Sequence, residues 1–201
     1  MPAKNIFWIL IAYLIGSIPW GLIIGKNFYH TDIREYGSGN IGGTNAGRVL
    51  GLPIGLLVIF LDGSKSLLMM YLASRFAPGI EKYVGLAVCI GHCFPVFAGF
   101  RGGKAVSCSY GYLLGLAIFV THDFLLTFLI PALIFFIILA FGRMVSLSSM
   151  CGVLSGAISI FCFVDRQIGM MVFALALFVI YRHSSNIKRI VNGTEAKLGR
   201  K

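Results

Sequence analysis

The stretch that decides the fold is residues 124–141, FLLTFLIPALIFFIILAF, which contains one hydroxyl and no charged side chain. Its length approaches the roughly 20 apolar residues with which an α-helix crosses the hydrocarbon core of a bilayer. Asp123 precedes the stretch, and Arg143 follows it after Gly142. Its apolar character therefore ends where a membrane helix would reach water, and the segment predicts a transmembrane helix.

The rest of the chain has the same character. Of its 201 residues, 58% are hydrophobic and 12% are charged, and the mean hydropathy is +0.89. Because a soluble domain carries about 25% charged residues, we expect an all-α, polytopic membrane protein that forms a single transmembrane domain over residues 1–201. Seven helices are expected, at about 5–25, 52–73, 83–99, 105–120, 124–141, 145–163 and 167–182. If the short, serine-containing fourth segment were re-entrant, the number would be six.

The distribution of basic residues favours seven helices. Cytoplasmic loops of membrane proteins carry an excess of Lys and Arg. With seven helices, one side receives twelve of the 17 basic residues, namely Lys26, Arg34, Arg48, Arg101, Lys104, Arg143, Arg182, Lys188, Arg189, Lys197, Arg200 and Lys201. The other side receives Lys4, Arg75, Lys82 and Arg166, while Lys65 lies within a span. We therefore expect the N-terminus outside and the C-terminus in the cytoplasm.

The net charge of +10 is explained by this orientation and by attraction to anionic lipid headgroups. Nucleic-acid binding would require a basic soluble surface or an aromatic stacking platform, and we expect no nucleic-acid partner. The five cysteines lie in or beside apolar segments without a CxxC pair, so they indicate no metal site. We expect no cofactor and no obligatory protein partner.

A long polar stretch, at about residues 26–50, surrounds the sequence GSGNIGGTNAGR of Gly37–Arg48. Glycines let a backbone turn tightly and present its N–H groups to an anion, while an arginine adds a charged planar donor. The same composition also occurs in flexible connectors, but the arginine among hydroxyl and amide groups favours anion binding. The candidate residues are Ser38, Asn40, Gly42, Thr44, Asn45 and Arg48.

A second polar element is GHCFPVFAGFRGGK, residues 91–104. Its end, Gly102-Gly103-Lys104, precedes a predicted helix, so free N–H groups, the positive helix end and an ammonium group would coincide. This combination suits a phosphate, although the GxxxxGK[ST] pattern of a Walker A loop is absent.

Two shorter elements complete the polar set. Ser146 follows Arg143 in the element Arg143–Ser149, where the fifth and sixth helices join, and His183 and Asn186, three residues apart, share a helical face near the chain end. Either element is also compatible with an ordinary loop or a solvated basic tail. Asp62 and Lys65 form an ionisable pair within the second helix, where we favour a structural role over contact with substrate because intramembrane charges are usually paired.

These elements, in this order, resemble the bacterial acyl-phosphate-dependent glycerol-3-phosphate acyltransferases. The matching stretches are Gly37–Arg48, Leu61–Lys65, Gly91–Lys104, Val145–Ser148 and His183–Ile187. The resemblance implies a seven-helix enzyme of the bacterial inner membrane with its active site at the cytoplasmic face. Such an enzyme transfers an acyl group from acyl phosphate to the sn-1 hydroxyl of glycerol 3-phosphate, giving lysophosphatidic acid and inorganic phosphate.

The resemblance also implies roles for individual residues. Gly102, Gly103 and Lys104, with the loop 38–44, are expected to surround phosphate groups. The positions where the family binds glycerol 3-phosphate are Arg48, Lys104, Ser146, His183 and Asn186. We expect catalytic roles for Lys104, Ser38, Ser146 and His183, and substrate binding by Asn40, Gly42, Thr44, Asn45, Arg48, Gly102, Gly103 and Asn186. The proton acceptor is either His183 or, as the resemblance favours, the acyl phosphate itself.

The sequence departs from the family pattern at four positions. Gly43 stands where alanine is usual, Ser66 and Ala105 where glycine is usual, and Arg101 where lysine is common. Ala105 is the most consequential, because a Cβ there crowds a backbone that should lie close to a phosphate.

Two alternative functions are less consistent with the sequence. Acyl-CoA-dependent acyltransferases use a His-x4-Asp pair, and none of the four histidines is followed by Asp five residues later. A carrier for organic phosphates should have repeats and interrupted helices near the membrane midplane, and the sequence has no visible repeat.

Overall fold

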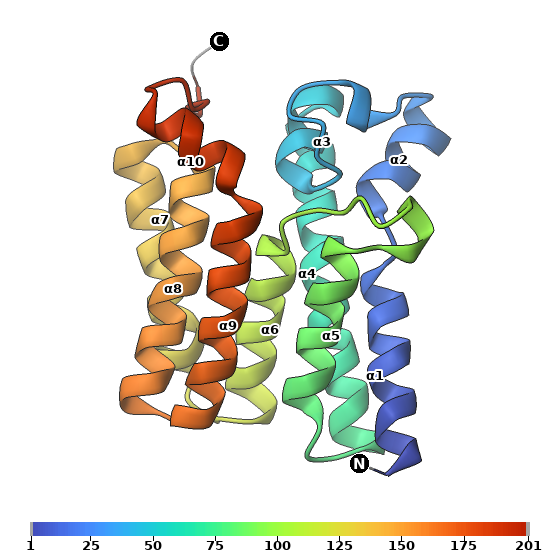
Figure 1. The fold of residues 1–201 in the computed structure, drawn as a ribbon, viewed down its shortest axis with the longest axis vertical. Helices are drawn as coiled ribbons and strands as arrows, with labels where there is room; N and C mark the ends of the chain where they lie inside the picture. Colours follow the sequence, from blue (N-terminus) through green and yellow to red (C-terminus); the bar gives the residue numbers. More distant parts are fainter. Residues whose placement is uncertain (1, 200–201) are drawn as a thin grey trace. The chain divides into compact units, whose positions relative to one another are not determined.

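The computed structural model describes residues 2–199, and within them it contains helices but no strand (Figure 1). Arg200 and Lys201, two of the tail charges counted above, lie outside the described residues. The chain divides into two compact units, Met1–Gly115 and Leu116–Lys201. The boundary lies within helix α6, and each unit is described by itself.

The first unit contains six α-helices or parts of them and two 3-10 turns. They are α1 (Ala3–Gly16), α2 (Trp20–Tyr29), η1 (Ile33–Glu35), α3 (Gly43–Leu50), α4 (Leu52–Phe76), α5 (Glu81–Cys93), η2 (Val96–Ala98) and the first part of α6 (Val106–Phe119). Helix α5 packs against both α1 and α4, and α3 packs against the first half of α4 (Figure 1).

The second unit continues from α6 into a helical bundle. Its further elements are the π-helical turn η3 (Leu125–Leu129), α7 (Ile130–Gly142), α8 (Val145–Phe163), α9 (Arg166–Arg182) and α10 (Ser184–Val191). Helix α8 packs against α7 and α9 (Figure 1). Because Pro131 has no N–H to donate, the wider π-helical turn before it is consistent with a local departure from α-helical hydrogen bonding.

Most helices lie where the sequence predicted them, but two boundaries were wrong. The predicted span 83–99 ends as a helix at Cys93, because Pro95 disfavours helical backbone in Phe94. The predicted polar loop 26–50 contains helix α3, so Arg48 is a helical residue rather than a loop residue.

The first predicted span, 5–25, is not one continuous helix. It is interrupted after Gly16, and α1 and α2 meet at a 40° bend. Pro19 explains the interruption, because proline removes a backbone donor and pushes the residue before it, Ile18, out of helical conformation. The ammonium of Lys65 donates to the carbonyls of Gly16 (3.1 Å) and Ile18 (2.9 Å), the second of which also accepts the Trp20 N–H (3.2 Å), and it forms an ion pair with Asp62 (2.8 Å).

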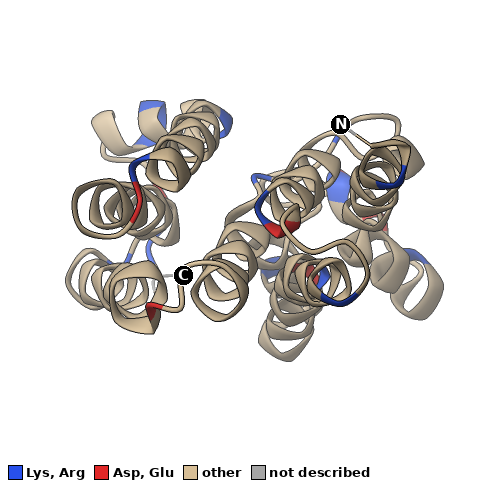
Figure 2. Ribbon diagram, turned by 90° about the horizontal axis from the view of Figure 1, so that it is seen from below, with Lys and Arg blue, Asp and Glu red and all other residues tan. Residues whose placement is uncertain are grey.

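The described helices are suited to a membrane. By length and composition, three of them could each cross a bilayer: α4, the continuous segment Leu125–Gly142, and α8. The bent pairs α1 with α2 and α9 with α10 would raise the number to five, and α6 is a shorter apolar helix. Most of the ribbon carries neither acidic nor basic residues (Figure 2). The seven-helix count and the orientation remain predictions.

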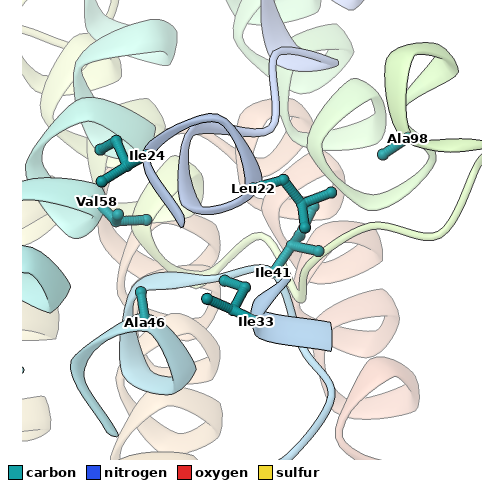
Figure 3. Packing of buried hydrophobic residues seen from close by; sticks show 7 residues of the cluster. All are labelled: Leu22, Ile24, Ile33, Ile41, Ala46, Val58 and Ala98. Carbon is teal, nitrogen blue, oxygen red and sulfur yellow. The ribbon is translucent and has the colours of Figure 1, made fainter. Parts of the chain in front are cut away.

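A compact apolar cluster supports the polar segments of the first unit (Figure 3). It joins α2, η1, the glycine-rich loop, α3, α4 and η2 through Leu22, Ile24, Ile33, Ile41, Ala46, Val58 and Ala98. Ile41 belongs to the stretch Gly37–Arg48 and Ala98 to the stretch 91–104. The two sequence elements expected to bind phosphate therefore share one hydrophobic base.

We predict that Lys65→Met lowers the stability of the protein by about 3–5 kcal/mol, because breaking a buried ion pair leaves an uncompensated charge. In this variant Asp62 would lose its 2.8 Å partner, and the Gly16 and Ile18 carbonyls would each lose one donor. The measurement is the thermal unfolding midpoint in detergent micelles. The control is Ser64→Ala on the same helix, where the hydroxyl donates to the Phe60 carbonyl. Equal midpoints for the two variants would contradict the prediction.

Candidate functional site

Asn45 organises the glycine-rich loop from within. Its buried amide nitrogen donates to the carbonyls of Ile33 (2.8 Å), Asn40 (2.9 Å) and Tyr36 (3.2 Å), and its oxygen accepts from the Ser38 N–H (2.8 Å). One side chain thus joins η1, the loop and α3. This geometry gives Asn45 a role in shaping the loop, whereas the sequence predicted contact with substrate.

The loop turns sharply before α3. Gly37 and Gly39 have φ angles of 62° and 68°, a region that glycine adopts without strain. The Asn40 side chain accepts the Gly42 N–H at 2.9 Å, and Gly42 precedes the first turn of α3. The first N–H groups of a helix have no partner within it and carry partial positive charge. With the exposed hydroxyls of Ser38 and Thr44 nearby in sequence, this turn suits an anion.

Close packing requires glycine at position 43, although the family that this chain resembles usually has alanine there. A Cβ at Gly43 would overlap the Ile59 side chain and lie 2.7 Å from the Gly55 carbonyl oxygen. Helices α3 and α4 therefore approach through glycine at this point, which explains the departure in physical terms.

The basic side chains around this loop differ in how far acidic groups neutralise them. Asp32 pairs with Arg34 (2.6 Å) and Lys26 (3.0 Å), and its hydrogen bond with the Arg34 side chain lowers the pKa of the Asp32 carboxyl. Lys26 and Arg34 are thereby partly neutralised. Arg48, in the last turn of α3, is exposed.

The second phosphate-loop candidate, Arg101–Lys104, lies against the end of α5. The Gly103 N–H donates to the His92 carbonyl at 3.0 Å. A Cβ at Gly103 would overlap the His92 ring, and a Cβ at Gly102 would overlap the His92 and Cys93 carbonyls. Both glycines are thus required by close packing beneath the loop. Lys104 is half-buried.

Two non-glycine residues flank this loop in left-handed backbone conformation. Phe100 has a φ of 61°, and the buried Ala105 has a φ of 57°. A left-handed L-residue costs about 1–2 kcal/mol. The departure noted at Ala105 therefore falls at a position where glycine would be unstrained.

In the second unit, a cluster around Glu195 brings two predicted site residues together. One carboxylate oxygen accepts from Ser146 Oγ (2.7 Å) and Asn186 Nδ2 (2.6 Å), and the other accepts from Arg189 Nε (2.7 Å). Burial opposes the charged form, but these hydrogen bonds outweigh it and lower the pKa of Glu195. Helices α8 and α10 are therefore connected through one carboxylate.

His183 lies at the junction of α9 and α10, which meet at 61°. The helix changes direction at His183, so His183 and Asn186 stand three residues apart at the start of α10, where the Ile187 N–H donates to the His183 carbonyl at 2.9 Å. His183 Nδ1 lies 2.8 Å from the Val179 carbonyl oxygen. Since a carbonyl can only accept, Nδ1 carries the proton, and Nε2 bears the lone pair when the ring is neutral.

Sequence reasoning missed Glu195. It is the only acidic residue after Asp165 in an otherwise basic tail, and that isolation is the signal that could have drawn attention to it. The structure places the other predicted residues in two sets. The first unit holds the loop with Ser38, Asn40, Gly42, Thr44, Asn45 and Arg48 and the loop with Gly102, Gly103 and Lys104, whereas the second holds Ser146, His183 and Asn186.

Comparison with known proteins points to one family. The family model for glycerol-3-phosphate acyltransferase matches residues 6–193. A glycerol-3-phosphate acyltransferase of Macrococcus caseolyticus is 44% identical over 191 residues, covering 94% of this chain and 95% of the relative. One of Listeria monocytogenes is 45% identical over 193 residues, covering 94% of each chain.

Solved structures agree. The crystal structure of PlsY, an integral membrane glycerol 3-phosphate acyltransferase, in its glycerol 3-phosphate form matches with a TM-score of 0.88 and 33% identity. Its lysophosphatidic acid form matches with a TM-score of 0.85 and 32% identity. Each match covers 98% of this chain and 96% of the other.

We predict that Glu195→Gln lowers the free energy of unfolding by about 2 kcal/mol at neutral pH, because hydrogen bonds to a charged group are lost. Since folding lowers the pKa of Glu195, its charge stabilises the folded chain above the usual glutamate range, and this contribution disappears as the pH falls. Unfolding midpoints of the two proteins should therefore converge in acid. A constant difference from neutral to acid pH would contradict the role of the charge.

We predict that Ala105→Gly raises the unfolding midpoint, because it removes left-handed strain of about 1–2 kcal/mol against an entropic loss of about 0.4–1 kcal/mol. The matched control is Ala46→Gly, at a buried position in the regular helix α3, where glycine should destabilise by about 1 kcal/mol. Thermal unfolding in detergent measures both. A lower midpoint for both variants would show that Ala105 is not strained.

Proposed function

The chain belongs to the glycerol-3-phosphate acyltransferase family, and from this premise we propose that it transfers a fatty acyl group from acyl phosphate to the sn-1 hydroxyl of glycerol 3-phosphate. Family membership makes it a membrane enzyme that acylates glycerol 3-phosphate. The products in this proposal are lysophosphatidic acid and inorganic phosphate, as the first step of phospholipid synthesis.

The observation that carries the choice of donor is the pairing of two glycine-rich loops on one apolar cluster. The loop around Ile41 and the segment containing Ala98 both pack on this cluster. Backbone N–H groups of the first loop and the Lys104 ammonium suit a phosphate, while the membrane helices suit an acyl chain. An acyl phosphate is the donor that combines these two chemistries.

The second unit provides the groups proposed for the acceptor. Ser146 and Asn186 both donate to Glu195, which also accepts from Arg189, and His183 lies at the adjoining helix junction. In this proposal they act with Arg48 and Lys104 on glycerol 3-phosphate. Family resemblance at these positions supports the assignment.

The proposed reaction is a direct acyl transfer. The glycerol hydroxyl oxygen forms a bond to the acyl carbonyl carbon, and the bond from that carbon to the phosphate oxygen breaks. Lys104 and loop N–H groups stabilise the charge that develops on the departing phosphate. Holding both substrates in register supplies a further part of the rate increase, since oriented reactants avoid much of the entropic barrier.

The hydroxyl proton passes to an oxygen of the acyl phosphate's own phosphate group, which leaves as inorganic phosphate. The alternative acceptor is His183, whose Nε2 bears a lone pair in the neutral ring. In either case Ser38 contributes a donor to the reacting groups, and Ser146, whose proton Glu195 accepts, contributes its hydroxyl oxygen as an acceptor. No metal or organic cofactor enters the reaction as proposed.

The proposed setting is the bacterial inner membrane, with seven spans, the N-terminus outside and the active site at the cytoplasmic face. The excess of basic residues on one side supports this orientation. Both water-soluble glycerol 3-phosphate and a membrane-borne acyl donor can reach a site placed at that interface.

We predict that the purified protein in liposomes releases inorganic phosphate and forms lysophosphatidic acid only when acyl phosphate and glycerol 3-phosphate are both present. Lys104→Ala should reduce turnover by about a hundredfold or more, because a donor to developing charge is lost. The matched control is Lys4→Ala, at an exposed position in the first turn of α1, which should retain activity.

Turnover with acyl-CoA in place of acyl phosphate would contradict the proposed donor. An acyl group on the sn-2 oxygen, detected by NMR of the product, would contradict the proposed regiochemistry. Uptake of glycerol 3-phosphate without phosphate release would indicate a carrier.

A further inference from the structure

A buried charged cluster crosses the first unit beneath the loop Arg101–Lys104. Asp62 on α4 pairs with Lys65 at 2.8 Å, and its same oxygen lies 3.5 Å from His92 Nδ1 on α5. The three side chains are between 3% and 6% exposed. Charges within a membrane bundle are costly, and the reaction proposed above gives none of these residues a task.

One end of the cluster is fixed to the fold. Lys65 donates to the Gly16 and Ile18 carbonyls at the break between α1 and α2. The Cys108 thiol donates to the Asp62 carbonyl at 3.1 Å. Lys65 thereby holds the Asp62 carboxylate, and Cys108 on α6 holds the Asp62 backbone, so the carboxylate is a rigid partner for the His92 ring.

The other end contacts the candidate phosphate loop. The His92 carbonyl accepts the Gly103 N–H at 3.0 Å. The three atoms that a Cβ on Gly103 would meet first all belong to the His92 ring, with Cδ2 and Cε1 at 2.9 Å. The imidazole ring of His92 therefore packs directly against Gly103.

This support matters because the loop is bounded by left-handed backbone at Phe100 and Ala105. Residues in sparsely populated conformations persist when the surrounding structure determines them. The neighbouring Lys104 can stabilise a leaving phosphate only if its position is held closely, since small displacements of reacting groups lower rates strongly.

We propose that His92, oriented by Asp62, is a positioning residue that sets the height of the loop Gly102–Lys104 and thereby the fit of the acyl-donor phosphate. The inference rests on the proposed function. It differs from a purely structural role because the affected quantity is turnover of the acyl donor by correctly folded enzyme.

The test is a double-mutant cycle between His92→Ala and Gly103→Ala, measured with acyl phosphate and glycerol 3-phosphate in liposomes. Each single variant should lower kcat/KM for acyl phosphate by up to about a hundredfold. The double variant should be no worse than His92→Ala alone, because the added methyl group occupies the space that the ring leaves.

Gly102→Ala is the matched control. Its Cβ would meet the backbone carbonyls of His92 and Cys93 and the Pro95 ring, so removing the His92 side chain should give no rescue. A second test uses Asp62→Asn, which should lower kcat/KM for acyl phosphate, as His92→Ala does. Its control is Asp165→Asn, where asparagine can still cap α9 at the Ile168 N–H.

Three outcomes would overturn the inference. Effects of His92→Ala and Gly103→Ala that multiply would show that the ring does not set the loop. A lowered unfolding midpoint with unchanged kcat/KM would reduce His92 to a structural residue. Wild-type protein without acyl-phosphate turnover would remove the proposed function and this inference with it, whereas active wild-type protein with an additive cycle would remove the inference alone.

Discussion

The interaction on which the first unit depends is the pairing of Lys65 with Asp62 and with two carbonyls of an interrupted helix. In an apolar environment every backbone group needs an internal partner, and the break at Pro19 deprives carbonyls of theirs. A single ammonium satisfies them, and Asp62 neutralises it. This arrangement lets α2 leave the direction of α1 at 40°, and α2 then contributes Leu22 and Ile24 to the apolar cluster beneath the loops.

Both candidate phosphate loops are held from their inner side. Asn45 fills the glycine-rich loop with hydrogen bonds to four backbone groups, and His92 supports Gly103 from below. A loop whose inner face is occupied in this way has a fixed backbone arrangement. Such preorganisation is what electrostatic stabilisation of a developing charge requires, because donors that need not reorient contribute most.

The sequence identified what depends on neighbours along the chain. Apolar runs predicted α4, α6, α8 and α9 within a few residues, and the family resemblance pointed to the loops now found on a common base. The sequence did not reveal residue roles that depend on contacts between distant parts of the chain. The sequence predicted that Asn45 binds substrate and missed its role within the loop, because two of its partners, the Ile33 and Tyr36 carbonyls, lie outside the motif. Glu195 received no role because Ser146 is far from it in the chain.

The interrupted helix also bears on the choice between enzyme and carrier. In carriers, the unwound backbone carbonyls of broken helices coordinate the transported ion or its coupling ion. Here the Gly16 and Ile18 carbonyls accept hydrogen bonds from Lys65 instead, so the protein's own cation occupies the position that a transported cation would take. The break arises at Pro19 and is stabilised by Lys65, whose partner Asp62 lies next to His92 and so connects the break to the loop at Gly103. A feature that would otherwise favour transport is, in this chain, connected to the proposed acyl-transfer site.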